Sequence, residues 1–206
     1  MKIYGHPLST CTRKLWFALA EKGEHADFEL VDLFAKAHKT PAHLARQPFG
    51  VVPVLDDDGF VLFESRAILR YLDARFPAPS LSPKSVTDLA RMNQWLSVDQ
   101  SYVAPHTRAL AIERIVKPRE HVEPDPGVER SALDALATAF RVYDEALDGP
   151  YLAGPSLSLA DISLAPYVAS LPMLRADDLL ERTPRLRAWW ARVSARDAWR
   201  AAVGTS

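Results

Sequence analysis

A cluster of prolines, Pro77, Pro79 and Pro83, interrupts the chain a little over a third of the way along its 206 residues. Prolines at this density cannot continue a helix, because each lacks a backbone N–H and clashes with the preceding turn. Before the cluster short apolar runs alternate with helical repeats, whereas after it nearly every segment has helical periodicity. We therefore predict one domain over residues 1–77, a linker over residues 78–85 and a second domain over residues 86–206.

The first predicted domain begins with a strand–helix–strand unit. Residues 2–4 and 28–31 are short apolar or β-branched runs, and apolar residues at helical spacing lie between them. Gly23 follows this helix where a left-handed C-cap is expected. Such a unit predicts two parallel strands that are joined by a crossover helix.

A hairpin and a further helix complete this domain. Apolar runs at residues 52–55 and 60–63 flank an Asp-Gly turn, which is a strong hairpin signal. Ser65 is placed to N-cap a helix that stops before Pro77. The order βαβ, helical loop, ββ and α predicts a small domain with a mixed sheet.

The second domain is predicted to be all-helical, so the fold class is α+β with two domains. One helix is expected over about residues 86–112 and another over about residues 128–147, with a polar loop between them. Ser158 precedes Asp161 by three positions, as in a capping box. Pro172 is expected to close that helix.

Charge and composition exclude several classes of protein. The formal net charge is -1, so no excess of basic residues is available for nucleic acid or an anionic membrane. No apolar run approaches the ~20 residues that span a bilayer, and the N-terminus lacks the apolar core of a secretory signal. One cysteine, Cys11, excludes an intrachain disulfide and a multi-cysteine metal site. We expect a soluble cytoplasmic protein.

Ser9 lies where the first strand leads into the first helix. Backbone N–H groups and the helix dipole stabilise an anion at such a position. Taken alone, however, Ser9 or Thr10 is more often a simple helix cap. The pair Glu64–Ser65 has the same two interpretations. Val52–Pro53 precedes a strand, and sequence alone favours a trans peptide bond there, because cis is the rarer form.

Six short segments carry more specific information. They are GHPLSTCTR at residues 5–13, AHKTP at 37–41, PFGVVP at 48–53, FESRAI at 63–68, YLAG at 151–154 and SLADI at 158–162. Together they resemble the cytosolic glutathione transferase family, most closely its phi-type members, in the family's order and spacing over essentially the whole chain. The resemblance implies a thioredoxin-like βαβαββα domain followed by an all-helical bundle. It also implies conjugation of glutathione, as co-substrate and without a metal, to small hydrophobic electrophiles.

The resemblance assigns roles to residues near the first strand and in the following loop. Ser9 matches the serine whose hydroxyl donates to the glutathione sulfur. Arg13 matches an arginine that is expected to brace the site without touching sulfur. His38 and Lys39 match residues that hold the glycyl carboxylate.

Further roles follow around the hairpin. Val52 matches the residue that exchanges backbone hydrogen bonds with the cysteinyl unit, and Pro53 matches the family's cis-proline. Glu64 and Ser65 match the pair that binds the γ-glutamyl end, and Arg66 is placed to assist with its carboxylate.

Two features leave alternatives open. Val51 stands where similar sequences usually have glutamine, which puts glutathione affinity in doubt and allows a non-catalytic glutathione- or ligand-binding protein. Cys11 near a helix N-terminus allows a glutathione-dependent thiol transferase or reductase. Its position, two residues beyond Ser9, argues against that chemistry.

An electrophile site is expected between the two domains, as the resemblance implies. The residues expected to line it are Leu8, Phe34, Tyr102, His106 and Leu110. The last three are spaced by four residues, which favours one helix face. Filling the core is an equally good interpretation for some of them. The resemblance also implies a twofold homodimer, with Phe49 and residues 67–76 as candidate contacts.

Overall fold

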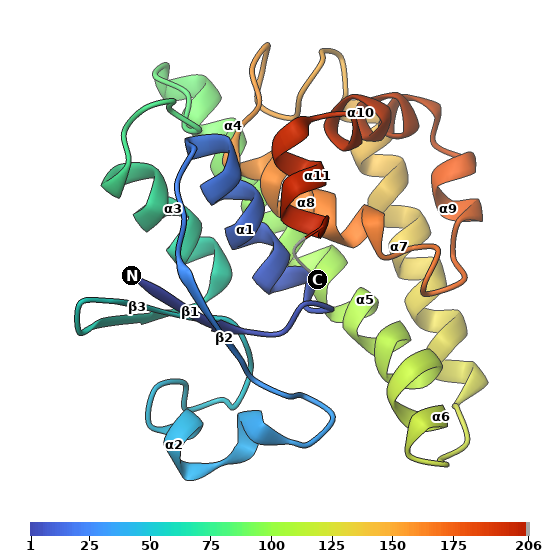
Figure 1. The fold of residues 1–206 in the computed structure, drawn as a ribbon. Coiled ribbons are helices and arrows are strands. Elements are labelled where there is room, and N and C mark those ends of the chain that lie inside the picture. The colour runs from blue at the N-terminus through green and yellow to red at the C-terminus, as the bar shows by residue number, and fades with distance from the viewer. Residues whose placement is uncertain (205–206) are drawn as a thin grey trace. The chain divides into compact units, whose positions relative to one another are not determined.

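The structure, a computed structural model, describes residues 1–204 (Figure 1). They form two compact units, one of residues 1–82 together with residues 195–204, the other of residues 83–194. The C-terminal helix α11 (Asp197–Gly204) thus belongs to the first unit, whereas the sequence pattern predicted it as part of a domain over residues 86–206. The physical reason is a packing partner on helix α1 (Thr10–Lys22): Trp199 meets Phe17 edge to face, with ring centroids 5.2 Å apart.

The first unit is built on a four-stranded mixed sheet. Its strands are β1 (Lys2–Gly5), β2 (Asp27–Leu30), β3 (Val54–Asp57) and β4 (Phe60–Phe63). The order in the sheet is β2-β1-β3-β4, with β1 parallel to β2, antiparallel to β3, and β3 antiparallel to β4. The predicted βαβ unit and hairpin are both confirmed.

The helices of this unit have caps that explain where α1 ends and where α3 begins. They are α1, the 3-10 turn η1 (Ala37–Lys39), α2 (Pro41–Leu44), α3 (Ser65–Arg75) and α11. Gly23 caps α1 at φ 69°, as predicted. Ser65 was predicted as the N-cap of α3, but it is the first helical residue and Glu64 is the N-cap.

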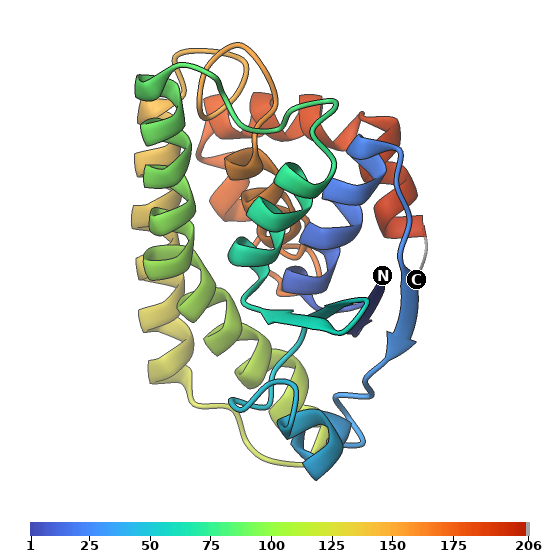
Figure 2. The same cartoon turned by 90° about the vertical axis from the view of Figure 1, so that its left-hand side faces the viewer.

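Two apolar clusters lie on opposite faces of the sheet, as the alternation of side chains along a strand requires. Figure 2 shows α1 and α3 side by side, and both cover one face. The cluster on that face consists of Ile3, Leu15, Leu19, Leu55, Ile68 and Leu72. On the other face Tyr4, Val31 and Val54 pack with Ala37 and Val52. The second cluster therefore ties the loops around residues 37 and 52 to the sheet.

The second unit is helical, as predicted. Its helices are α4 (Val86–Val98), the π-helical turn η2 (Asp99–Val103), α5 (Ala104–Ala111), the π-helical turn η3 (Ile112–Val116), α6 (Lys117–Arg119), α7 (Pro126–Ala146), α8 (Leu159–Ala169), α9 (Asp178–Glu181) and α10 (Pro184–Ser194). The helix expected over residues 86–112 thus continues to residue 119 through two wider turns. Within residues 1–204 no helix has both the length and the hydropathy that crossing a membrane requires.

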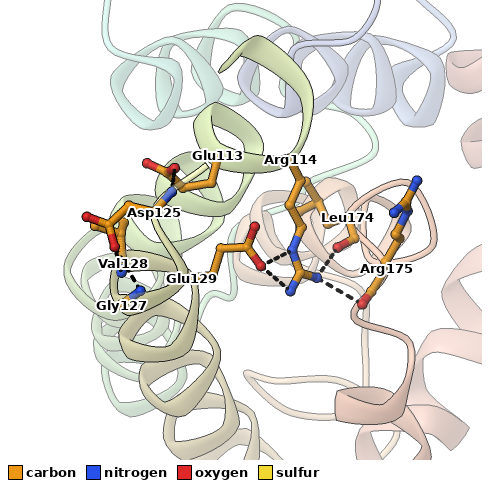
Figure 3. A network of polar contacts seen from close by, with 8 residues as sticks. All are labelled: Glu113, Arg114, Asp125, Gly127, Val128, Glu129, Leu174 and Arg175. Atoms are coloured by element: carbon orange, nitrogen blue, oxygen red, sulfur yellow. Dashed lines mark hydrogen bonds and ion pairs between the residues drawn. The ribbon is translucent and has the colours of Figure 1, made fainter. Parts of the chain in front are cut away.

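A polar network fastens this long helix to α7 (Figure 3). The Arg114 guanidinium donates to Glu129 through Nε and Nη2, at 3.0 and 2.8 Å from Oε2. Its Nη1 donates to the carbonyls of Leu174 and Arg175, at 2.6 and 3.0 Å. One planar cation therefore joins η3, α7 and the segment before α9, which is the geometry that arginine suits best.

The predicted capping box at the start of α8 is confirmed and extends further than predicted. The buried Asp161 carboxylate accepts from the backbone N–H and hydroxyl of Ser158, at 2.9 and 2.8 Å. It also accepts from the Leu152 N–H at 2.9 Å and from the Trp189 indole N–H at 2.8 Å. Burial raises the pKa of Asp161, and these four donors oppose that rise. One side chain therefore joins the 151–158 loop, α8 and α10.

We expect Asp161→Ala to destabilise the protein severely. The change leaves two backbone N–H groups and an indole N–H buried without an acceptor, which costs at least ~3 kcal/mol of unfolding free energy. Urea denaturation followed by circular dichroism measures the loss. Asp134→Ala, on an exposed position of α7, is the matched control and should change stability by no more than ~0.5 kcal/mol. Equal stability of the two variants would contradict the role given to Asp161.

Candidate functional site

The sheet register brings the candidate residues of the first unit to one end of the sheet. Tyr4 pairs with Val54, and Val54 pairs with Phe63 on its other side. Because β3 runs antiparallel to β1 and β4, it begins where those strands finish. The last pair of β1 with β2, Gly5 with Leu30, lies at the same end. The residues that follow β1, β2 and β4 or precede β3 are Ser9, His38, Lys39, Val52, Pro53, Glu64 and Ser65.

Ser9 is the N-cap of α1, with φ −75° and ψ 118°. Its Oγ accepts a hydrogen bond from the Thr12 N–H at 3.2 Å. A hydroxyl has one donor besides its acceptor lone pairs, so this cap leaves the O–H hydrogen able to donate elsewhere. Helix capping and donation to an anion are therefore compatible at Ser9, although sequence alone presented them as alternatives.

The turn before Ser9 is held by several hydrogen bonds. The Ser9 N–H donates to the His6 carbonyl at 2.9 Å, and the Leu8 N–H donates to His6 Nδ1 at 3.2 Å. Arg13 Nε donates to the Pro7 carbonyl at 2.7 Å. Partial burial lowers the pKa of the Arg13 guanidinium. The ordinary pKa of arginine is so high that the side chain stays charged. Arg13 thus braces the backbone of this turn.

Two side chains of the loop after β2 hold three successive carbonyls that lead into β3. Lys39 Nζ donates to the carbonyls of Phe49 and Gly50, at 3.3 and 2.8 Å. His43 Nε2 lies 2.8 Å from the Val51 carbonyl, to which it must donate because a carbonyl only accepts. His38 lies half-buried in η1 beside Lys39.

His43 is a residue that sequence reasoning missed. It is only 4% exposed, but in the sequence it looks like any polar residue of a solvated loop. Only the fold shows that its ring reaches a carbonyl eight residues further along the chain. By fixing the Val51 carbonyl, His43 sets the direction in which the chain enters Val52.

The Val52–Pro53 peptide bond is cis. The ordinary trans form favoured by the sequence alone is therefore wrong, and the cis form implied by the resemblance is present. Val52 lies beyond the last ladder pair of β3, and within residues 1–204 its backbone N–H and C=O make no hydrogen bond. Its backbone groups are therefore available to an extended peptide.

The start of α3 is suited to a carboxylate. Glu64 has φ 72°, a left-handed conformation that costs a non-glycine residue energy, and its side chain makes no capping hydrogen bond. The Glu64 side chain therefore leaves the start of this 11-residue helix uncapped, at the positive end of the helix dipole. Glu64 itself is exposed, whereas Ser65 and Arg66 are buried. The geometry suits an anion at the N–H groups and a cation at the Glu64 carboxylate.

The residues expected to line an electrophile site have different environments. In the first unit Leu8 is exposed, as is Phe34, whose ring packs edge-on to His6 with centroids 5.6 Å apart. In the second unit Tyr102 is 60% exposed, His106 is half-buried and Leu110 is completely buried.

The predicted common face of Tyr102, His106 and Leu110 therefore needs correction. Four residues turn an α-helix by about 400°, so each step of four moves the side chain about 40° around the axis. Tyr102 also lies in the π-helical turn η2, which widens the helix locally. The series consequently passes from solvent into the packed interior, and His106 borders a groove of about 380 Å³ beside α7.

Cys11 is the second residue of α1 and is half-buried. It lies two residues beyond Ser9, inside the first helical turn and not at the N-cap.

Comparisons with known proteins agree across both units. Residues 8–75 match the family model "Glutathione S-transferase, N-terminal domain", and residues 101–197 match "Glutathione S-transferase, C-terminal domain". The chain is 36% identical to Glutathione S-transferase 3 of Zea mays over 98% of its own length and 93% of the relative's. It is 33% identical to Glutathione S-transferase F10 of Arabidopsis thaliana, covering 94% of this chain and 92% of the relative.

Solved structures give the same result. Glutathione transferase F7 from Populus trichocarpa superposes with a TM-score of 0.91 at 32% identity, covering 98% of this chain and 97% of that chain. Glutathione S-transferase-I bound with the ligand lactoylglutathione superposes with a TM-score of 0.88 at 28% identity, covering 100% and 99%.

We expect Gly50→Ala to destabilise the protein more than Gly23→Ala. Both glycines have a left-handed φ, 59° and 69°, so each substitution costs about 1–2 kcal/mol from backbone strain. A Cβ at Gly50 would also lie 2.8 Å from Lys39 Nζ and 2.9 Å from the His38 carbonyl, whereas a Cβ at Gly23 meets nothing within 4 Å. Crowding should add ~1–3 kcal/mol at Gly50 alone. Urea unfolding of both variants measures the difference, and equal losses would show that the loop is not tightly held.

Proposed function

The chain belongs to the glutathione S-transferase family, and we propose that it conjugates the glutathione thiolate to small hydrophobic electrophiles, with Ser9 as the catalytic residue. The observation that carries this proposal is the Ser9 hydroxyl at the start of α1. Its oxygen accepts the cap hydrogen bond from Thr12, and its hydrogen is left to donate to a sulfur. The thiol proton goes to solvent, and the thiolate attacks the electrophilic carbon. The carbon–sulfur bond forms as the leaving group departs with its bonding electrons, as chloride does from a chloronitrobenzene.

The stabilisation required is of the right size. A thiol with a pKa near 8.5 is only a few per cent thiolate at pH 7. Making it mostly ionised requires a fall of about two pKa units, or ~2.7 kcal/mol. A hydrogen bond to a charged acceptor contributes about 1.5–3 kcal/mol, and a helix N-terminus adds ~0.3–1 kcal/mol. Ser9 at the N-terminus of the 13-residue α1 supplies both contributions.

Glutathione would lie along the loops at this end of the sheet. Its γ-glutamyl carboxylate is held by the first N–H groups of α3 at Ser65 and Arg66, and its ammonium by Glu64. Its cysteinyl unit exchanges backbone hydrogen bonds with Val52, as the unpaired N–H and C=O of that residue allow. The neighbour bound with lactoylglutathione, a glutathione derivative by name, supports a ligand of this kind.

The glycyl carboxylate would lie beside His38 and Lys39. An ammonium has three donors, and two carbonyls occupy two of those of Lys39. The third is left for a carboxylate. Val51 offers an apolar side chain here. Affinity for glutathione is therefore lower than in a protein with glutamine at this position, because the polar contact of the glutamine is missing.

The electrophile is proposed to contact apolar side chains with few polar groups, as is usual for such sites. On the first unit these are Leu8 and Phe34. On the second unit the proposed contacts are the amphipathic Tyr102 and the polar His106, whereas Leu110 is completely buried. We place the protein in the cytoplasm, where glutathione is kept reduced.

We also propose a twofold homodimer. Phe49 is 69% exposed, and its ring meets that of Phe63 in a T-shaped contact with centroids 6.2 Å apart. A large aromatic side chain in this position is typical of an interface anchor. Residues 67–76, which include most of α3, are the second candidate contact.

We expect Ser9→Ala to lower kcat/KM for conjugation of glutathione to a chloronitrobenzene by roughly 10- to 150-fold, the loss of one charge-assisted hydrogen bond. Ser9→Gly should lose as much activity, although glycine is a good N-cap and costs only a few tenths of a kcal/mol in stability. Comparing the two variants separates the contribution of the hydroxyl to activity from the contribution of the helix cap to stability. Thr10→Ala, one residue further along, is the matched control and should retain activity.

Cys11→Ala decides between this mechanism and its alternatives. It should leave conjugation nearly unchanged. If it abolishes activity while Ser9→Ala does not, a thiol transferase or reductase using Cys11 is the better account. If the wild-type protein binds glutathione without turnover, the chain is a binding protein.

We expect the wild-type protein to sediment as a dimer at micromolar concentration and Phe49→Ser to sediment as a monomer, because an exposed anchor is lost. Leu30→Ser is the matched control, since Leu30 is 57% exposed on the edge strand β2, away from the candidate contacts. Analytical ultracentrifugation distinguishes the species. A wild-type monomer would contradict the dimer.

A further inference from the structure

His6 makes three hydrogen bonds around the serine turn, and none of the roles described above uses them together. Its carbonyl accepts from the Ser9 N–H at 2.9 Å, and its own N–H donates to Thr12 Oγ1 at 3.3 Å. Its ring nitrogen Nδ1 accepts from the Leu8 N–H at 3.2 Å. The imidazole is 8% exposed, so it forms part of the packed interior of the turn.

The hydrogen bond to Leu8 determines the form of the ring. A backbone N–H only donates, so Nδ1 must carry a lone pair and the proton of the neutral ring is on Nε2. The same ring packs edge-on to Phe34, with an interplanar angle of 82°. His6 therefore contacts both residues that we place at the electrophile site on the first unit, Leu8 through its backbone and Phe34 through its ring.

We propose that His6 is a positioning residue for thiolate chemistry: its unprotonated Nδ1 holds the Leu8 amide and so fixes the turn that presents the Ser9 hydroxyl. This inference rests on the proposed function of Ser9. Pro7, which follows His6, has no backbone N–H. Leu8 and Ser9 are therefore the next two residues that can donate from the backbone. His6 accepts from both, one through its ring and one through its carbonyl.

The charge on His6 follows from its surroundings. Burial lowers the pKa of the imidazole below its ordinary value, and the nearby Asp32 carboxylate, from the loop after β2, opposes this less strongly. A further charged group beside the turn is the Arg13 guanidinium of α1, which donates to the Pro7 carbonyl. The ring is therefore neutral at pH 7, as the Leu8 hydrogen bond requires.

Protonation of Nδ1 would remove this acceptor. Because the folded state lowers the pKa of His6, the hydrogen bond contributes stability above the ordinary histidine pKa and loses it as the pH falls through the folded value. The turn should then loosen under mildly acidic conditions, before the rest of the first unit unfolds.

The test uses two substitutions of His6 that differ in one property. His6→Asn keeps an acceptor, since an asparagine side chain bonds readily to the N–H two residues further on, but it does not titrate. His6→Leu keeps bulk and removes the acceptor. We expect His6→Leu to lower kcat roughly 3- to 10-fold, as loss of one neutral hydrogen bond implies. KM for glutathione should stay within about twofold, because the contacts to both its carboxylates are untouched.

The pH dependence provides a readout that a merely structural residue would not change. Wild type and His25→Asn, which removes an exposed histidine near the end of α1, should share an acid-side loss of kcat. In His6→Asn that loss should shift to lower pH, with kcat at pH 7.5 close to wild type. If His6→Asn falls as far as His6→Leu, or if both variants keep the wild-type profile, the proposal is overturned.

Nuclear magnetic resonance of the protein without substrates keeps the test independent of turnover. The Leu8 amide shift should follow the titration of the His6 ring in wild type and be insensitive to pH over that range in His6→Asn. If Leu8 does not respond in wild type, the contact is absent and the proposal fails. If Leu8 responds but no variant conjugates glutathione, only the proposed function of Ser9 fails. This measurement needs only wild type and His6→Asn, so it tests the proposal even if His6→Leu does not fold.

Discussion

The antiparallel pairing of β3 with β1 determines where every proposed contact to glutathione lies. If the sheet were entirely parallel, the start of β3 would lie at the opposite end from the residues that follow β1. Instead Tyr4, Val54 and Phe63 stand side by side in the ladder, so the chain leaves β1 and β4 where it enters β3. A shift of this register by one residue would turn Val54 from one apolar cluster toward the other face. The core on both faces of the sheet thus protects the geometry of the site.

Around that end of the sheet, several side chains hold the backbone. Arg13, Lys39 and His43 donate to carbonyls, and His6 accepts from an N–H. Loops carry backbone polar groups that the sheet does not satisfy, and each of these side chains supplies a partner within hydrogen-bond distance. The backbone of the candidate site is therefore held by the protein itself, so the proposed ligand would have less backbone to order on binding.

Local signals predicted much of this structure, and non-local contacts account for what they missed. Gly23, the Asp-Gly hairpin and the Ser158–Asp161 box each depend on a few neighbouring residues, so the sequence sufficed for them. The return of α11 to α1 and the reach of His43 to Val51 depend on the fold, and no local pattern encodes them. The sequence predicts Ser65 as the N-cap of α3, because serine is preferred at that position. The N-cap is Glu64, one residue earlier, which adopts a strained positive φ directly after β4.

Position 51, where the resemblance leads one to expect glutamine, lies beside the candidate site. A glutamine there would offer its side chain to glutathione, and Val51 cannot. The carbonyl of Val51 is nevertheless held by His43 at 2.8 Å, so the backbone direction into Val52 does not depend on the side chain at 51. The backbone groups of Val52, which would meet the cysteinyl unit, and the hydroxyl of Ser9, which would meet its sulfur, are positioned by other residues. In the proposed function, Val51 would therefore weaken the hold on glutathione, while the turn around Ser9 would still place its sulfur.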